Sequence, residues 1–218
     1  MVQLKLPLFP LNTVFFPGMT LPLHIFEPRY REMINLCLDQ QQPFGVVLID
    51  SGPETGAPAN PCRVGTLGSI SRVERLAGGR LNIEVLGQER FQILELQHER
   101  PYLTGLVEHF PLLATHPTAA AACARRLTPW VTRYLKVLGD AAHLDLDQQS
   151  MPARPTALAY LSAIVIQIPL IEKQALLSCP STEDMLERER TLFRREISLV
   201  RAMLTSPQAQ HNADLSPN

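Results

Sequence analysis

Apolar and polar residues alternate along several short stretches in the first half of the chain. The alternation is clearest in residues 4–8, 21–26, 81–85 and 91–93, while residues 44–49 are apolar without a break. A period of two places neighbouring side chains on opposite faces of a strand. A continuous apolar run of this length indicates a strand that is buried on both faces. We therefore predict a series of short strands in this half.

Glycines mark the expected turns between these strands. Gly78–Gly79 separates two strand-like stretches, 65–76 and 80–86, and suits a tight hairpin because glycine accepts positive φ. Gly87–Gln88 suggests the next corner, and the stretch 102–110 has the character of a final strand. Short strands at close spacing with glycine corners predict a small closed or half-closed barrel.

One helix is expected within this strand-rich half. Apolar side chains with helical spacing form one stripe, which comprises Tyr30, Met33, Ile34, Cys37 and Leu38. Pro28 suits the first helical turn, where its missing N–H costs nothing, and the helix should end before Pro43. We expect the stripe to cover one end of the barrel.

The pattern becomes helical in the second half of the chain. Apolar positions recur with helical spacing in four segments, which are 123–138, 156–168, 170–177 and 186–204. Pro129 should kink or restart the first of these helices, and Gly139 could end it. Ser181 and Thr182 offer N-caps for the last helix. The sequence thus predicts an α+β fold, with a β-barrel domain at 1–113, a helical bundle subdomain at 118–204 and a disordered tail at 205–218.

Composition narrows the possible partners. The 218-residue chain is 45% hydrophobic and has a formal net charge of −1, with basic and acidic residues balanced in both halves. Nucleic-acid binding requires a clustered cationic surface, which neither half offers. No apolar run reaches the roughly 18–20 residues of a membrane span, and prolines break the apolar start of the chain. We expect a cytoplasmic protein with no nucleic-acid or membrane partner.

Recognisable catalytic motifs are absent from the sequence. It contains no GxxxxGK[ST] phosphate loop, no GxSxG elbow and no HExxH metal helix, and its histidines and its four cysteines are scattered singly. Lys173 is flanked by apolar residues, but the adjoining Glu172 and Gln174 favour an exposed helix face over a serine–lysine dyad. The glycine- and proline-rich loop 50–61 lacks phosphate-binding spacing. We expect no enzymatic activity, no cofactor and no metal. A hydrolase built from distant side chains is an alternative.

Several blocks of sequence closely resemble the Lon protease N-terminal domain family. The first, LPLFPLNTVFFPGMTLPLHIFEPRYREMI, runs from Leu6 to Ile34. The others are FGVV at 44–47, GTLGSI at 65–70, GRLNIEVLGQERFQI at 79–93 and KQALL at 173–177. The resemblance extends over roughly residues 4–204, and its N-terminal block is the most specific.

This resemblance implies a PUA-like pseudo-barrel followed by a helical subdomain. It also implies a role in binding unfolded or partly folded polypeptide, because this part of Lon recruits substrate protein. The ATPase and peptidase parts of Lon have no counterpart here, so we expect a free-standing, non-catalytic binding module that could dock on a separate protease or ATPase. PUA-like barrels can also bind RNA, which makes an RNA-binding module a second alternative. The oligomeric state is left open.

The candidate substrate-binding residues come from the first block. They are Phe15, Phe16, His24, Phe26, Glu27 and Arg29. If the segment around Phe15 and Phe16 is extended, at most one of the two faces the core and the other could join an exposed apolar patch. Glu27 and Arg29 could either cap the next helix and form an ion pair, or help to define a peptide groove. A peptide could bind in an apolar groove or pair with an open barrel edge.

Overall fold

The computed structural model describes the chain apart from residues 1–2, 54–55, 57–58, 143–150 and 206–218. The chain folds into two compact units, Met1–Leu112 with Pro169–Ser178, and Leu113–Ile168 with Cys179–Asn218. The first junction of these units lies between Leu112 and Leu113, and the domain boundary at 113–118 stays a prediction. Pro169–Ser178, which the sequence analysis placed in the helical part, clusters with the first unit instead.

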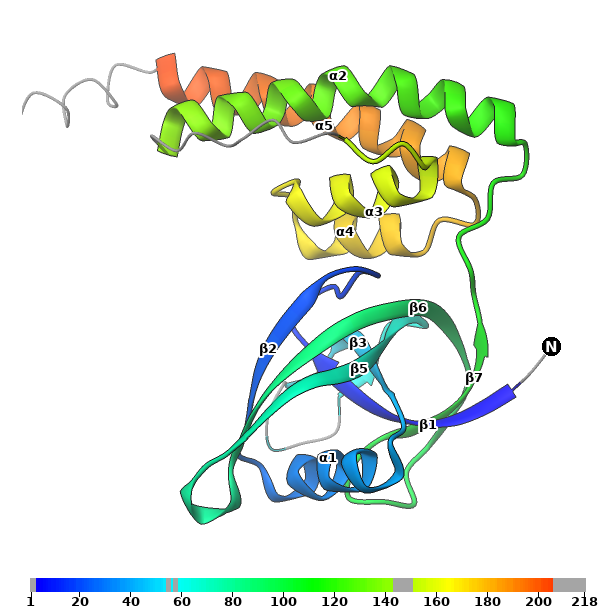
Figure 1. Ribbon diagram of the computed structural model, residues 1–218, viewed down its shortest axis with the longest axis vertical. Coiled ribbons are helices and arrows are strands. Elements are labelled where there is room, and N and C mark those ends of the chain that lie inside the picture. Colours follow the sequence, from blue (N-terminus) through cyan, green and yellow to red (C-terminus); the bar gives the residue numbers. More distant parts are fainter. Residues whose placement is uncertain (1–2, 54–55, 57–58, 143–150, 206–218) are drawn as a thin grey trace, which may run out of the picture. The chain divides into compact units, whose positions relative to one another are not determined.

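Seven strands of the first unit form one mixed sheet (Figure 1). They are β1 (Gln3–Leu11), β2 (Thr20–Ile25), β3 (Phe44–Ser51), β4 (Asn60–Pro61), β5 (Val64–Arg75), β6 (Leu81–Gln97) and β7 (Thr104–His109). The order β1-β7-β6-β5-β3 closes on itself, because Gln3–Pro7 of β1 pairs antiparallel with β7 and Leu8–Leu11 pairs parallel with β3. The α+β fold with a β-barrel is therefore confirmed.

Strand β6 has a different partner along each of its halves. Leu81–Leu86 pairs with β2 and Phe91–Gln97 pairs with β7, while β5 follows the other edge. The corner predicted at Gly87–Gln88 is wrong, because β6 runs through it without a break. Gly87 instead permits a close approach of two backbones, since a Cβ at this position would overlap the carbonyl oxygen of Phe16.

Helix α1 (Pro28–Gln40) begins at the predicted proline and covers one end of the barrel (Figure 1). Its predicted stripe packs into a core cluster of the barrel unit that also contains Phe9 and Phe44, and Met33 and Ile34 are fully buried there. Gly78–Gly79 forms the predicted turn, and both glycines have φ of 73°. Burial of each large apolar side chain contributes roughly 1.5–3 kcal/mol, so this interior positions the strand edges that surround it.

Helix α4 (Leu170–Leu177) belongs to the barrel unit and is bonded to its strands by buried polar side chains. The Gln174 side-chain amide donates to the Val64 carbonyl at 2.9 Å. The Arg90 guanidinium donates to the Leu177 carbonyl at 2.6 Å and lies over the Phe110 ring at 4.5 Å. Both donors are buried, so these bonds form away from water.

The second unit contains α2 (Pro117–Ala142), α3 (Pro155–Val165) and α5 (Thr182–Thr205). The restart predicted at Pro129 is wrong, because α2 continues through it and also passes Gly139. The N-cap predicted at Ser181 is confirmed, since its hydroxyl accepts from the Asp184 N–H at 3.2 Å. Tyr134 and Phe193 pack edge to face in the core of this unit. The tail predicted to be disordered lies outside the described residues from 206 onward.

Among the described helices, none combines the length and the apolar character that crossing a membrane requires.

Candidate functional site

Strand β2 has one open edge. Among the described strands it pairs only with β6. The Gly87 N–H donates to the Met19 carbonyl at 2.9 Å. Hydrogen-bonded and non-hydrogen-bonded pairs alternate along an antiparallel ladder, so the next pair, Thr20 and Leu86, has no main-chain hydrogen bonds between its two residues. Antiparallel alternation then turns the main-chain groups of Thr20, Pro22 and His24 away from β6. Pro22 therefore sits where its missing N–H interrupts no ladder bond, and the edge offers three carbonyls and two N–H donors.

A pocket of about 300 Å³ lies between β1 and β2, and we call it the β1–β2 pocket. Its lining is mostly apolar and comes from residues 9–11 of β1, residues 22–27 and Tyr30. The Phe9 ring contacts Tyr30 edge to face at 4.2 Å, which gives the pocket a rigid aromatic wall. Phe26 is 53% exposed in the same lining, so its ring is open to contact from outside the chain.

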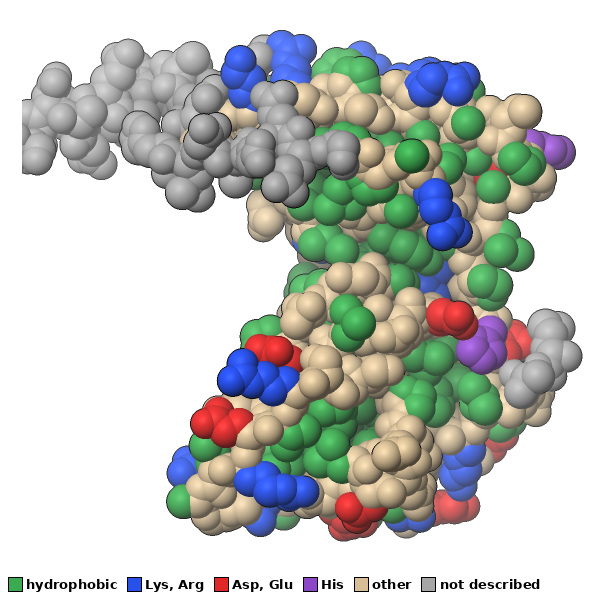
Figure 2. All heavy atoms as spheres, in the orientation of Figure 1, with side chains coloured by type: hydrophobic (Ala, Val, Ile, Leu, Met, Phe, Trp, Pro, Cys, Tyr) green, Lys and Arg blue, Asp and Glu red, His purple; other side chains and the backbone are tan. Residues whose placement is uncertain are grey.

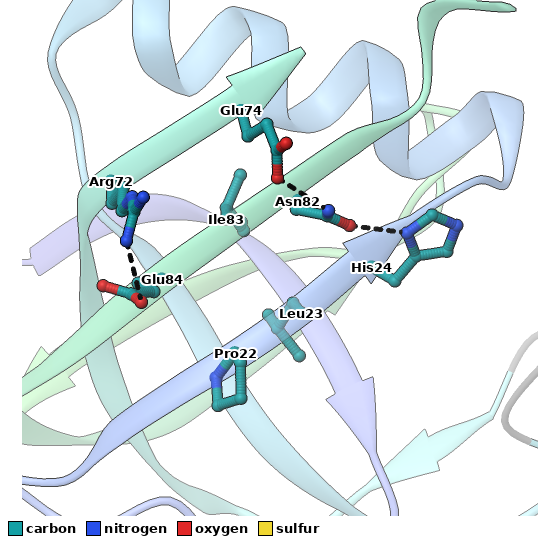
Figure 3. Close-up of a pocket in the computed structure, with 8 residues that line it drawn as sticks. All are labelled: Pro22, Leu23, His24, Arg72, Glu74, Asn82, Ile83 and Glu84. Carbon is teal, nitrogen blue, oxygen red and sulfur yellow. Dashed lines mark hydrogen bonds and ion pairs between the residues drawn. The ribbon is translucent and has the colours of Figure 1, made fainter. Parts of the chain in front are cut away.

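A second pocket, of about 420 Å³, lies over β2, β6 and β5, and we call it the β2–β6–β5 pocket (Figure 3). A polar row crosses it, in which the Asn82 Oδ1 accepts from His24 Nδ1 at 2.7 Å and the Asn82 Nδ2 donates to Glu74 at 3.0 Å. Arg72 and Glu84 form a further ion pair of 3.9 Å. Because Pro22, Leu23 and His24 line both pockets, β2 forms the ridge between them.

Three of the predicted site residues meet in the β1–β2 pocket, namely His24, Phe26 and Glu27. His24 and Phe26 stack, with ring centroids 6.0 Å apart and an interplanar angle of 24°. Arg29 contacts Glu27 at 3.0 Å, and the Gly56 N–H donates to the same carboxylate at 3.5 Å. Glu27 occupies the N-cap position of α1 but makes no side-chain cap bond, so its charge neutralises Arg29 instead.

Phe15 and Phe16 do not contribute to an exposed patch. Both are 1% exposed, so the expectation that one of them faces solvent is wrong. The expectation assumed a strand, in which neighbours alternate between faces. These residues lie in an irregular segment between β1 and β2, and irregular backbone can turn two adjacent side chains inward.

Several lining residues were missed by the sequence analysis. Pro22 and Leu23 belong to a predicted strand, and the proline was itself a signal for an edge strand. Asn82 and Glu74 had no such signal. Asn82 reaches His24 across 58 positions of sequence, and only the strand pairing brings them together.

The linings of the two pockets combine apolar side chains with imidazole, amide and charged groups. Among the described lining residues of both pockets there is no Ser, Thr or Cys that could act as a nucleophile beside His24. The described residues also hold no group of three or more His, Cys, Asp and Glu side chains that could bind a metal ion.

Two titratable groups outside these pockets have shifted pKa values. Burial raises the pKa of Cys37 to about 11, which keeps this thiol protonated at neutral pH. Burial lowers the pKa of Lys173 from its ordinary value.

The fold is that of Lon N-terminal domains, as two solved structures show. The Lon N-terminal domain protein from Xanthomonas campestris matches with a TM-score of 0.59 and 23% identity, over 85% of this chain and 96% of that one. The N-terminal domain of the Mycobacterium avium complex Lon protease matches with a TM-score of 0.67 and 18% identity, over 87% of this chain and 98% of that one. At these identities the likeness defines the fold alone.

The sequence gives the family. Residues 5–195 match the protein family described as the ATP-dependent protease La (LON) substrate-binding domain, and the chain belongs to this family. Lon protease 2 of Syntrophobacter fumaroxidans is 28% identical over 196 residues, which are 88% of this chain and 25% of that protein. The chain thus spans about a quarter of the length of this relative.

Proposed function

We propose that the chain is a non-catalytic module that binds unfolded or partly folded polypeptide in an extended conformation along β2. The observation that carries this proposal is the open edge of β2 between two pockets that share its residues 22–24. An added strand would find main-chain partners on Thr20, Pro22 and His24. The family description, a substrate-binding domain, supports the same role.

The expected affinity is modest. A main-chain hydrogen bond contributes about 0.5–1.5 kcal/mol, and a buried apolar side chain about 1.5–3 kcal/mol. Few such contacts fit along six residues of β2, and ordering the peptide opposes them. Because main-chain bonds read no side chain, the site would accept many sequences, as a sampler of unfolded protein requires. The bound chain could then pass to a separate protease or ATPase.

Polypeptide fits the site better than RNA does. The two pockets contain the carboxylates of Glu27, Glu74 and Glu84, which would repel phosphate. On the face shown in Figure 2, acidic and basic side chains of the barrel unit are interspersed. A hydrolase would need a nucleophile or an activated water near His24, and the described lining supplies no Ser, Thr or Cys for the first.

The main-chain edge can be tested with two substitutions at one position. His24→Pro removes an outward N–H that β6 does not use, whereas His24→Ala removes the side chain and keeps that N–H. Binding of a fluorescent polypeptide kept unfolded by cysteine alkylation would be measured by polarisation. We expect His24→Pro to weaken binding roughly tenfold and His24→Ala to weaken it less.

Phe26→Ala tests the apolar contact and should weaken binding to a similar extent. Leu199→Ala is its control, because Leu199 is a comparably exposed apolar residue of α5, at 47%. Circular dichroism of each variant checks the fold. The proposal is wrong if the native chain binds no unfolded polypeptide, or if all four variants bind it equally well.

A further inference from the structure

A third pocket of the barrel unit, of about 120 Å³, has a different character, and we call it the Tyr102 pocket. The residues that matter to its chemistry are Pro10, Arg29, Tyr30, His98, Arg100 and Tyr102. Its volume corresponds to about four water molecules at roughly 30 Å³ each. The pocket can therefore hold a small polar group and little more.

The hydroxyl of Tyr102 is a buried polar group in this lining. The residue is 2% exposed, and its hydroxyl has no hydrogen-bond partner among the described residues. A buried hydroxyl without a partner is unfavourable, and most such groups in proteins bond to something. The hydroxyl has almost no accessible surface, so an acceptor that enters the pocket becomes its partner only when the side chains around the hydroxyl move aside.

The charges around the pocket specify an anion. Arg100 is exposed and its guanidinium lies 5.9 Å from the centre of the Tyr102 ring, and His98 adds an imidazole beside it. Arg29 is ion-paired with Glu27, but no Asp or Glu is among the described lining residues of the pocket itself. The site thus combines cationic donors with a neutral hydroxyl donor, which is the arrangement that binds a carboxylate.

The Tyr102 pocket adjoins the β1–β2 pocket. Pro10 and Tyr30 line both, so a chain lying between β1 and β2 reaches the Tyr102 pocket directly. We propose that the Tyr102 pocket binds a carboxylate of the polypeptide held along β2, with Arg100 and the Tyr102 hydroxyl as its donors. This inference rests on the proposed function and adds a chemical requirement to it.

Two pairs of short, otherwise uncharged apolar peptides would test the requirement and identify the source of the carboxylate. The first pair differs only in a free C-terminal carboxylate or a carboxamide. The second pair is amidated and differs only in one internal Glu or Gln. We expect a preference of roughly tenfold for the charged member of at least one pair, measured by competition at low salt. The pair that responds shows whether the main-chain terminus or a side chain enters the pocket.

Arg100→Gln should reduce this preference to near one, and Arg80→Gln, at an exposed residue that precedes β6, should keep it. Tyr102→Phe retains the buried ring and should lower the preference about three- to tenfold. Equal binding of both members of each pair, or an unchanged preference in Arg100→Gln, would overturn the proposal. Failure of the proposed function would look different, because then none of the four peptides would bind any variant.

Discussion

Glu189 is a fully buried carboxyl in the helical unit. Ser162 is its hydrogen-bond partner, with an oxygen–oxygen distance of 2.8 Å. The same hydroxyl lies 2.8 Å from the Leu158 carbonyl and 3.1 Å from that of Ala159. A hydroxyl has one hydrogen to share among three oxygens. Ser162 therefore divides its hydrogen between the Glu189 carboxyl and these carbonyls, which leaves the buried carboxyl only partly satisfied.

Burial raises the pKa of Glu189 well above its ordinary value, and the bond from Ser162 lowers it by less. A raised pKa in the folded state means that folding favours the protonated form. The resulting stability is fully present below the ordinary glutamate pKa of about 4.3, and is lost as pH rises towards the folded value. Within that window each pH unit lowers the free energy of unfolding by about 1.4 kcal/mol.

Glu189→Gln should remove this pH dependence. The variant keeps the size and the hydrogen-bonding capacity of the side chain but cannot ionise, so we expect it to be more stable than the native chain at pH 8. Thermal unfolding between pH 5 and 9 measures the difference. Glu99→Gln, at a side chain that is 76% exposed, should follow the native profile. A native-like slope in Glu189→Gln would show that Glu189 is not the group that titrates.

At the scale of elements, α4 depends on the barrel. Its eight residues are too few to form a stable helix in isolation. The Arg90 guanidinium binds its last carbonyl, Leu177, at the negative end of the helix dipole. A strand residue therefore caps a helix that lies 87 positions away in sequence.

Arg90→Met should release the C-terminal end of α4. The methionine fills part of the space but leaves the buried Leu177 carbonyl without this donor, so we expect a loss of roughly 1–3 kcal/mol in stability. Hydrogen exchange should accelerate in residues 170–178 more than in α5, and urea unfolding gives the free energy. Arg63→Met, at an exposed arginine of the same unit, should change neither. Unchanged exchange in α4 would contradict the proposed cap.

Most elements of this fold could be predicted from the sequence, because local patterns specify them. The stripe of α1 and its start at Pro28 are examples. The path of β6 through Gly87 could not be predicted, since that glycine is required by the distant backbone of Phe16 and not by a turn. The residues of the candidate site likewise fall into those that a local pattern predicts and those that distant contacts bring together. His24 and Phe26 came from a local motif, whereas Asn82, Arg100 and Tyr102 reach their pockets only through strand pairing and loop closure.

At the scale of the whole molecule, the barrel unit is discontinuous. Its α4 comes from Pro169–Ser178, after the intervening Leu113–Ile168 has entered the other unit. A fragment of residues 1–112 would lack the partners of Arg90 and Val64 that α4 provides. We expect its β5 and β6 amides to exchange faster than those of the full chain. Equal exchange in the fragment would show that α4 is dispensable to the barrel.

The late position of α4 in the chain affects how the protein is made. During translation the strands emerge first, and the 56 residues of Leu113–Ile168 must follow before α4 leaves the ribosome. At 5–20 residues per second this interval lasts roughly 3–11 s. Through that time the nascent barrel lacks the helix that binds Arg90 and Val64, so it is exposed to aggregation and to capture by chaperones.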